Sequence, residues 1–494
     1  MPIRLSLSRQ TIVPLIVACG LFMENLDSTV VATALPSIAR TLGENPLRLN
    51  LAITSYLLSL AVFIPLSGWL ADRFGPRTVF SSAILVFTTG SICCGLSHSL
   101  AQLVAGRIVE GLGGAMMVPV GRLVLMRTVP KAELVNAMTY LTVPALIGPI
   151  MGPPLGGFIV TYSSWRWIFF INIPIGILGV FLARRFIPDA REDSARPLDA
   201  RGFALVALGL VGLMFGFETI GRGLLPNDLV VALLVMGAVC TGLYVVHARR
   251  TPHRILDLSL FQYVTFRANV IGGTLFRTGI GALPFLLPMM FQLGFGLTAF
   301  SSGLLTFTAT AGAMLMKVTA APIIRRFGFR NVLIGNALIS GAFLFSYALF
   351  TPSTPHAVII ATLLMGGFFR SLQFTALHTV AYAEIPPPQL SQATTLASMA
   401  QQLAQSFGVG LGALILHLTV WWTGSEELSA RHFALAFIGV GCVSMLSLPF
   451  FWKLPADAGE EISGRRSGTG GAAALEAAAP LASPPEIPQD RRRA

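Results

Sequence analysis

The sequence has little charge. Only 11% of its 494 residues are Asp, Glu, Lys or Arg, whereas 54% are hydrophobic. Soluble globular domains carry roughly 25% charged residues, so this chain lacks the polar side chains that a water-facing surface would need. This shortage argues against a soluble enzyme or binding protein and indicates a protein that faces lipid.

The sequence also lacks the strict alternation of apolar and polar residues that is typical of a membrane β-barrel. Its apolar residues come instead in continuous runs of about 20, which as helix can cross a hydrocarbon core of about 30 Å. Lipid offers backbone groups no hydrogen-bond partner, so only helices and closed barrels can span it. We therefore predict an all-α polytopic membrane protein.

Signatures of disulfide, metal and nucleotide chemistry are missing as well. The five cysteines, Cys19, Cys93, Cys94, Cys240 and Cys442, lie inside apolar runs without metal-site spacing and are interpreted as small buried hydrophobic residues. There is no G-x-x-x-x-G-K-[ST] and no H-E-x-x-H motif. We therefore expect no enzymatic activity, no cofactor and no metal. No cleavable signal peptide is evident.

The apolar runs that are present number about fourteen. They lie near residues 11–35, 49–71, 78–97, 101–124, 135–161, 165–187, 201–221, 228–247, 266–292, 300–322, 331–351, 356–381, 394–420 and 432–453.

Basic residues are concentrated in alternate connections between these runs. The connections concerned carry Arg73 and Arg77; Arg122, Arg127 and Lys131; Arg184, Arg185, Arg191 and Arg196; Arg249, Arg250 and Arg254; and Arg325, Arg326 and Arg330. The positive-inside rule then places both termini in the cytoplasm. Lysine is almost absent beside arginine, and Ala, Gly and Pro are abundant, which is typical of a high-GC bacterial genome, so we expect the protein in a bacterial inner membrane. The net charge of +12 thus reflects topology and not a patch for nucleic acid.

The spacing of the runs predicts four regions. Residues 1–187 form an amino-terminal six-helix bundle, residues 188–250 a linker with two extra transmembrane helices, residues 251–455 a second six-helix bundle, and residues 456–494 a disordered cytoplasmic tail. A short R-F-G-x-R repeat, at 73–77 and 326–330, follows the second helix of each bundle. Such matched loops indicate two related halves, an organisation found in transporters.

The first of these loops contains Gly68, Asp72, Arg73, Gly75 and Arg77. The glycines allow a tight turn, and the charged side chains can pair with neighbouring helix ends, which would make a latch between helices. A loop that only sets topology is the simpler alternative.

Ionisable residues inside the first and fourth spans are the candidates for proton coupling. Asp27 and Glu24 lie one turn apart in the first span, and Arg107 and Glu110 lie in the fourth. A charge at that depth costs about 2.5–3.5 kcal/mol on insertion scales. Asp27 should therefore exchange a proton readily, with Arg107 as its natural partner. A permanently paired structural Asp27 is the alternative.

The fifth span carries the pattern Gly148-Pro149-x-x-Gly152-Pro153-x-x-Gly156-Gly157. Gly148, Gly152 and Gly156 recur every fourth residue and give a smooth face for close helix packing. Pro153 removes a backbone hydrogen bond and bends the helix.

The second half carries three cations inside predicted spans: Arg277, Lys317 and Arg370. Intramembrane cations usually line a cavity or pair with acids, so these three could bind an anionic group on a substrate. Pairing with Glu24, Asp27 or Glu110, or snorkelling of Lys317, would also explain them. Gln373 and His378 could add polar contacts.

Together these motifs resemble the EmrB/QacA-type, fourteen-helix drug:proton antiporter family of the major facilitator superfamily. The resemblance rests on the 68–77 loop, Leu26–Pro36, Arg107–Ala115, the glycine pattern of the fifth span and Ser164–Pro174, and it covers residues 10 to 453. It implies two six-helix bundles plus two central helices, a cytoplasmic gate at 68–77, proton transfer at Asp27 and Arg107, and an exporter signature in the fifth span.

Three positions depart from the family pattern. Glu110 and Glu24 stand where relatives usually or often have Gln, and Thr139 replaces an expected glycine. The extra acids leave the proton stoichiometry open.

We therefore expect a proton-coupled antiporter, working as a monomer, that exports small molecules in a multidrug efflux activity. Its partners would be its substrate, protons and the lipid bilayer, and no nucleic acid. An exporter of organic anions such as carboxylates or metal chelates is the alternative, favoured by the three cations. A non-transporting membrane sensor is a more distant one.

Overall fold

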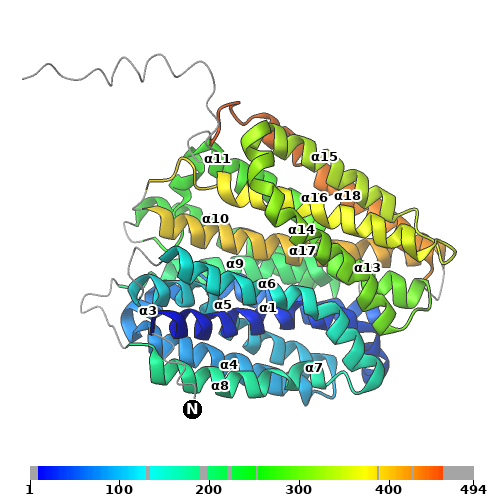
Figure 1. Ribbon diagram of the computed structural model, residues 1–494, viewed down its shortest axis with the longest axis horizontal. Coiled ribbons are helices and arrows are strands. Elements are labelled where there is room, and N and C mark those ends of the chain that lie inside the picture. The colour runs from blue at the N-terminus through cyan, green and yellow to red at the C-terminus, as the bar shows by residue number, and fades with distance from the viewer. Residues whose placement is uncertain are drawn as a thin grey trace, which may run out of the picture.

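The computed structural model describes residues 9–128, 134–188, 197–219, 225–251, 254–386, 389–424 and 428–459. Every regular element in these ranges is helical (Figure 1), which confirms the all-α prediction. Thirteen helical segments in this part of the chain are long and apolar enough to cross a membrane. The predicted span at 135–161 corresponds to a further helix, α6 (Leu134–Tyr162), of 29 residues. The predicted tail and the 188–200 linker lie mostly outside the described residues.

The first six spans lie in the lower half of Figure 1, coloured blue to cyan-green. They are formed by α1 (Arg9–Leu42); η1 (Pro46–Leu49), α2 (Asn50–Phe63) and α3 (Leu66–Phe74); α4 (Pro76–Gly95); α5 (Leu100–Thr128); α6; and α7 (Trp167–Phe170) with α8 (Asn172–Phe186). The break between α2 and α3 falls at Pro65, which has no N–H to continue the helical ladder.

The last six spans occupy the upper half of the same view. They are formed by α11 (Val264–Arg267), η4 (Ala268–Gly272), α12 (Gly273–Gly281), α13 (Leu283–Met289) and η5 (Met290–Gly294), which make one span; α14 (Ala299–Phe327); α15 (Phe329–Tyr347); α16 (His356–Val380); α17 (Leu390–Thr423); and α18 (Ala430–Met445) with α19 (Leu448–Trp452). The elements η4 and η5 are π-helical turns, which often accompany functional sites in helices.

Two helices, α9 (Ala200–Thr219) and α10 (Asn227–Arg250), connect these two groups and pack on each other. Their contact is close because glycines face it: a Cβ on Gly212 would lie 2.6 Å from the Leu233 carbonyl oxygen. The outer side of α10 carries Val231, Val235, Val239 and Leu243, each between 52% and 58% exposed. Four-residue spacing puts these apolar side chains on one face, which is the face that lipid would cover.

The segment after α10 is held by polar contacts outside the spans. It leads into η3 (Leu258–Gln262), where Asp257 accepts hydrogen bonds from Ser259 and forms a 2.6 Å ion pair with Arg254. Burial opposes the charge on Asp257, but these hydrogen bonds and the Arg254 charge outweigh it and lower the pKa of Asp257.

The two R-F-G-x-R loops adopt the same backbone geometry. Gly75 joins α3 to α4 with φ at +83°, and Gly328 joins α14 to α15 with φ at +77°. Side chains with a Cβ rarely adopt this conformation. The short repeat in the sequence therefore marks equivalent turns in the two halves.

The halves are joined by hydrogen bonds toward the end of the molecule that carries α7, called the α7 end (Figure 1). Gln292 donates from Nε2 to the Thr33 carbonyl at 3.0 Å, and the Phe300 N–H donates to Thr161 Oγ1 at 3.1 Å. The opposite end, called the α3 end, carries the Gly75 and Gly328 turns.

Candidate functional site

A cavity of about 540 Å³ lies between the two halves. Residues from α1, α2, α5 and α6 line it on one side, and residues from α12, α13, α14, α16 and α17 line it on the other. Lys317 and His378 extend the lining toward the α3 end, whereas the α7 end is closed by the bonds between the halves. The cavity therefore occupies the middle of the molecule, where transporters place their substrate sites.

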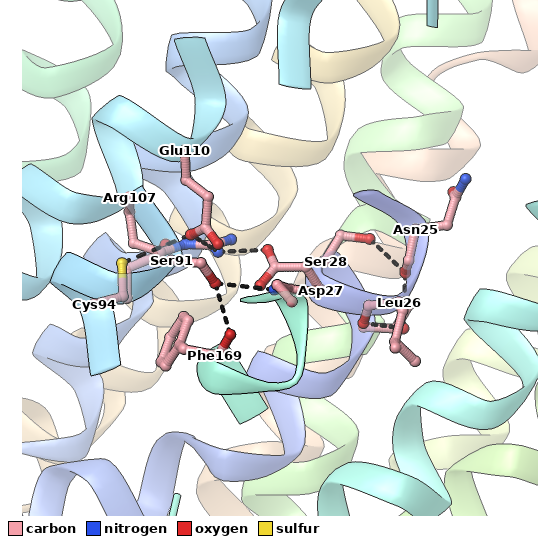
Figure 2. A network of polar contacts seen from close by, with 12 residues as sticks. Asn25, Leu26, Asp27, Ser28, Ser91, Cys94, Arg107, Glu110 and Phe169 are labelled. Carbon is pink, nitrogen blue, oxygen red and sulfur yellow. Dashed lines mark hydrogen bonds and ion pairs between the residues drawn. The ribbon is translucent and has the colours of Figure 1, made fainter. Parts of the chain in front are cut away.

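Arg107 organises the wall of this cavity on the first half (Figure 2). One of its terminal nitrogens, Nη1, lies 2.5 Å from Asp27 Oδ2 on α1 and 2.6 Å from Glu110 Oε2 one turn along α5. Its Nε donates to the Ala52 carbonyl on α2 at 2.9 Å. The side chains of Arg107, Asp27 and Glu110 are each at most 1% exposed. One guanidinium thus ties α1 to α2 and α5.

Neighbouring side chains complete this group. The guanidinium carbon of Arg107 lies 4.1 Å from the ring centroid of Tyr56, a cation–π contact, and Cys94 Sγ approaches Glu110 Oε2 at 3.6 Å. Arg107 and Tyr56 line the cavity. Asp27 and Glu110 are not among its lining residues and lie behind the arginine. Cys94 is buried, whereas Cys19 and Cys240 are half-buried and Cys93 and Cys442 are exposed, so the interpretation of all five cysteines as buried residues is correct only for Cys94.

The charges of this group do not balance when both acids are ionised, because two carboxylates then share one guanidinium. An uncompensated buried charge is costly. Asp27 Oδ1 and Glu110 Oε1 are buried oxygens without a hydrogen-bond partner in the described structure. A single proton on either carboxyl would remove the excess charge. Glu24 is also buried on α1, at 8% exposure.

The three cations predicted in the second half line the same cavity, opposite Arg107. Arg277 on α12 donates to Asn269 Oδ1 at 3.0 Å and lies 5.9 Å from the Phe374 centroid. Lys317 on α14 donates to Thr375 Oγ1 at 3.2 Å. No ion pair joins Arg277, Lys317 or Arg370 to a carboxylate in the described part of the chain. The alternative that they pair with acids of the first half is therefore wrong for this conformation.

The charged part of the lining has one sign. Arg107, Arg277, Lys317 and Arg370 line the cavity, and no Asp or Glu does so among the described residues. His378 also lines it, as expected. Gln373 does not: it is fully buried and donates to the Leu333 carbonyl on α15 at 3.1 Å, so its predicted contact with the site is wrong.

Some lining residues gave too weak a signal to be found in the sequence. Gln401 and Gln405 on α17 and Tyr56 on α2 all reach the cavity. Uncharged polar residues are tolerated at many positions of membrane helices, so only their position against the cavity distinguishes them. The pairing of the two glutamines at four-residue spacing is the one sequence feature that points to a common face.

The glycine pattern of α6 packs mainly on α1 of the same half. A Cβ on Gly148 would be 3.0 Å from the Leu26 nitrogen, and a Cβ on Gly152 would be 2.0 Å from Thr29 Oγ1, both on α1. Gly156 likewise faces Val30. Gly157 faces the other way, because its Cβ would lie 2.5 Å from the Ala299 carbonyl oxygen on α14. Pro153 lines the cavity.

The 68–77 loop lies at the α3 end. Gly75 makes the positive-φ turn described above, and Asp72 and Arg77 are half-buried, while Arg73 is exposed. Gly68 is exposed, and a Cβ there would meet nothing within 4 Å. In this conformation the loop needs a glycine at 75 and tolerates a side chain at 68.

Comparisons with known proteins agree with this architecture. The family model "Major Facilitator Superfamily" matches residues 17–266 and 270–486. The "Putative multidrug resistance protein MdtD" of Pectobacterium atrosepticum is 38% identical over 90% of this chain and 95% of its own length. The protein of the same name from Salmonella heidelberg is 39% identical over 90% and 94%.

Solved structures share the fold at low identity. A D-xylose–proton symporter matches with a TM-score of 0.67 and 16% identity, over 92% of this chain and 99% of that one. A bacterial homologue of the human lysosomal transporter Spinster, in an inward-facing and unoccupied conformation, matches with a TM-score of 0.65 and 14% identity, over 94% and 100%. The chain is thus a multi-pass membrane transporter and not an enzyme, and it belongs to the Major Facilitator Superfamily and, within it, to the EmrB/QacA-type family.

Proposed function

We propose that this protein is a proton-coupled antiporter that exports small molecules across the bacterial inner membrane, with multidrug efflux as its activity. The observation that carries the proposal is the buried group of Asp27, Arg107 and Glu110 on the wall of the central cavity. The name of its bacterial relatives, a multidrug resistance protein, supports the direction and the class of substrate.

The imbalance of charge in this group supports proton coupling. When one carboxyl holds a proton, Arg107 is balanced by the other carboxylate. When that proton leaves, the excess negative charge attracts the cation more strongly and draws it back from the cavity. Proton release and the charge presented to the cavity are therefore linked through one side chain.

Alternating access requires the halves to separate at one end while they close at the other. The positive-inside pattern supports a cytoplasmic position for the α3 end and for both termini. The α7 end, closed here, would then face outward, so this conformation would take up substrate from the cytoplasm. The glycine face of α6 packs on α1, and Gly157 on its other side faces Ala299 of α14 in the second half, so α6 would let the halves move against each other. One chain contains both halves and is proposed to work as a monomer.

The test is transport in proteoliposomes with an imposed pH gradient. Asp27→Asn keeps the size of the side chain but cannot release a proton, so gradient-driven transport should fall to background. Asp228→Asn, an exposed acid at the start of α10, is the matched control and should transport normally.

Full coupling in the Asp27→Asn protein would assign the proton to Glu24 or Glu110. Absence of transport in the parent protein, under any gradient, would favour the sensor alternative.

Export of organic anions, such as carboxylates or metal chelates, is the second candidate. It is favoured by the lining of the cavity, which presents four cations and no acid in the described residues. Only Arg107 has carboxylate partners. In a cavity of low dielectric, an anionic substrate would supply the missing counter-charge.

A further inference from the structure

The guanidinium of Arg277 is held by the π-helical turn that precedes it in the same span. Asn269 lies in this turn, η4, eight residues before Arg277, and is only 1% exposed. Its side-chain oxygen Oδ1 accepts a hydrogen bond from Arg277 Nη2 at 3.0 Å, and its backbone carbonyl accepts one from Nη1 at 3.3 Å. A single residue thus binds both terminal nitrogens of the guanidinium.

The π-helical turn explains why this backbone carbonyl is available to a side chain. In a regular α-helix the Gly273 N–H would donate to the Asn269 carbonyl, four residues earlier. Here the Gly273 N–H donates to the carbonyls of Ala268 and Val270 instead. A buried carbonyl without a partner is costly, and Arg277 Nη1 supplies the hydrogen bond. The irregular turn therefore creates an acceptor that a continuous α-helix would not offer.

Two further residues fix the position of the guanidinium. Gly273 leaves space for it, because a Cβ at this position would lie 2.7 Å from Arg277 Nη1. Phe374 on α16 contributes an aromatic ring, whose centroid lies 5.9 Å from the guanidinium carbon. We call Asn269, Gly273 and Phe374 the Arg277 cradle.

The cradle holds the arginine with neutral groups. An amide, a peptide carbonyl and an aromatic ring carry no net charge, and within the described ranges no carboxylate pairs with Arg277. A guanidinium has more N–H donors than two hydrogen bonds use, and Arg277 Nε has no hydrogen-bond partner in the described structure. Arg107, in contrast, is bound by two carboxylates. The cradle therefore fixes the position of Arg277 at the cavity and leaves its charge uncompensated.

From this geometry we propose that Asn269 is a positioning residue that sets the charge selectivity of the cavity. It holds Arg277 in place without neutralising it, so the guanidinium can bind an anionic group of the substrate. The inference rests on the proposed function, because it takes the central cavity as the path of the substrate, and it assigns a residue to the anionic alternative.

The sharpest test changes the charge of the cradle and not its shape. Aspartate is close to asparagine in size, and in Asn269→Asp it can accept both hydrogen bonds from Arg277, but its charge would balance the guanidinium. The probes are the naphthoate and naphthylmethylammonium ions, which share one ring system and carry opposite charges. Binding of each is measured to the purified protein in phosphatidylcholine nanodiscs, without a pH gradient.

We expect the parent protein to bind naphthoate more tightly than naphthylmethylammonium. In Asn269→Asp the affinity for naphthoate should fall about tenfold or more, because a hydrogen bond to a charged group is lost, while the affinity for the ammonium probe should be kept or rise. Asn331→Asp, which places the same charge at an exposed position of α15, is the matched control and should keep the parental ratio of affinities.

A second variant decides the matter if Asn269→Asp does not fold. Asn269→Ala removes Oδ1 but keeps the backbone carbonyl, so it should weaken naphthoate binding about threefold without affecting the ammonium probe. If Asn269 acts through Arg277, Asn269→Ala should cause no further loss in the Arg277→Gln background. A residue that only supports folding would lower the binding of both probes, with or without Arg277.

Three results would overturn the proposal: naphthoate binding to the parent no tighter than that of the ammonium probe, an unchanged ratio in Asn269→Asp, or a further loss in the double variant. Failure of the proposed function would look different. The parent protein would then show the expected ratio of affinities in nanodiscs but would not transport under an imposed pH gradient.

Discussion

In the first half of the transporter, Arg107 is paired with two acids, Asp27 and Glu110, at 2.5 and 2.6 Å. In the second half, Arg277, Lys317 and Arg370 line the same cavity, and no carboxylate pairs with them in the described residues. Both halves consist of six helical spans and have an equivalent turn, at Gly75 and at Gly328, so the charges can be compared within similar frameworks.

This contrast teaches where each ligand of the transporter is expected to bind. Arg107 lies between two acids, one of which can gain and lose a proton. Each gain or loss changes the net charge of the buried group. Cations without a carboxylate partner in the described residues are suited to bind an anionic group of the substrate. We infer that the first half carries the proton and that the second half recognises the substrate.

The largest expected effect comes from removing the buried cation of the first half. Arg107→Leu would leave two buried acids without their cation, and loss of one partner of a buried ion pair typically costs about 3–5 kcal/mol. We expect most of the protein to be lost from the membrane fraction or to melt at much lower temperature. Adding Asp27→Asn and Glu110→Gln should restore folding without restoring transport. A stable Arg107→Leu single variant would contradict the conclusion that Arg107 is the counter-charge of the two buried acids.

The second effect concerns the unbalanced half. Arg277→Gln or Arg370→Gln removes a charge without leaving an acid exposed, so folding should be preserved. If the substrate is an anion, its affinity should fall about tenfold to a hundredfold, since a hydrogen bond to a charged group contributes about 1.5–3 kcal/mol. Binding of a cationic drug should change less.

Binding of both substrate classes to the purified variants measures this difference. Lys453→Gln, an exposed cation outside the cavity, is the control. Equal losses for anions and cations would leave multidrug efflux of neutral and cationic compounds as the better assignment.

The smallest expected effect lies at the α1–α6 contact inside the first half. Gly152→Ala would place a methyl group 2.0 Å from Thr29 Oγ1, which must then shift. We expect folding to be retained and the transport rate to fall several-fold, because a displaced α6 would also change its contact with α14 of the other half. Gly335→Ala on α15, where a Cβ meets nothing within 4 Å, is the matched control for rate and stability. Equal transport rates in the two variants would show that the packing of α6 on α1 does not limit the rate, which would contradict the prediction.

Much of the fold could be predicted from particular residues. The apolar runs corresponded to α1 through α19 because span length depends only on bilayer thickness. The turn at Gly75 was predictable since a loop of that shape needs a positive φ. Asp27, Arg107 and Glu110 were identifiable because a charge inside an apolar run is costly in lipid and therefore usually marks a functional site. The prediction for Gln373 was wrong because a neutral amide costs less to bury. A single backbone carbonyl, here that of Leu333, can accept its hydrogen bond.

The sequence by itself determined the helices, the two related turns and the set of buried charges, because these depend on local composition and on the cost of charge in lipid. Only the tertiary structure decided which charges meet. It placed Glu110 on the same nitrogen of Arg107 as Asp27, the partner expected from the sequence, and it placed three cations of the second half on one cavity wall. Such pairings depend on how helices distant in sequence rotate and pack, which no local pattern encodes.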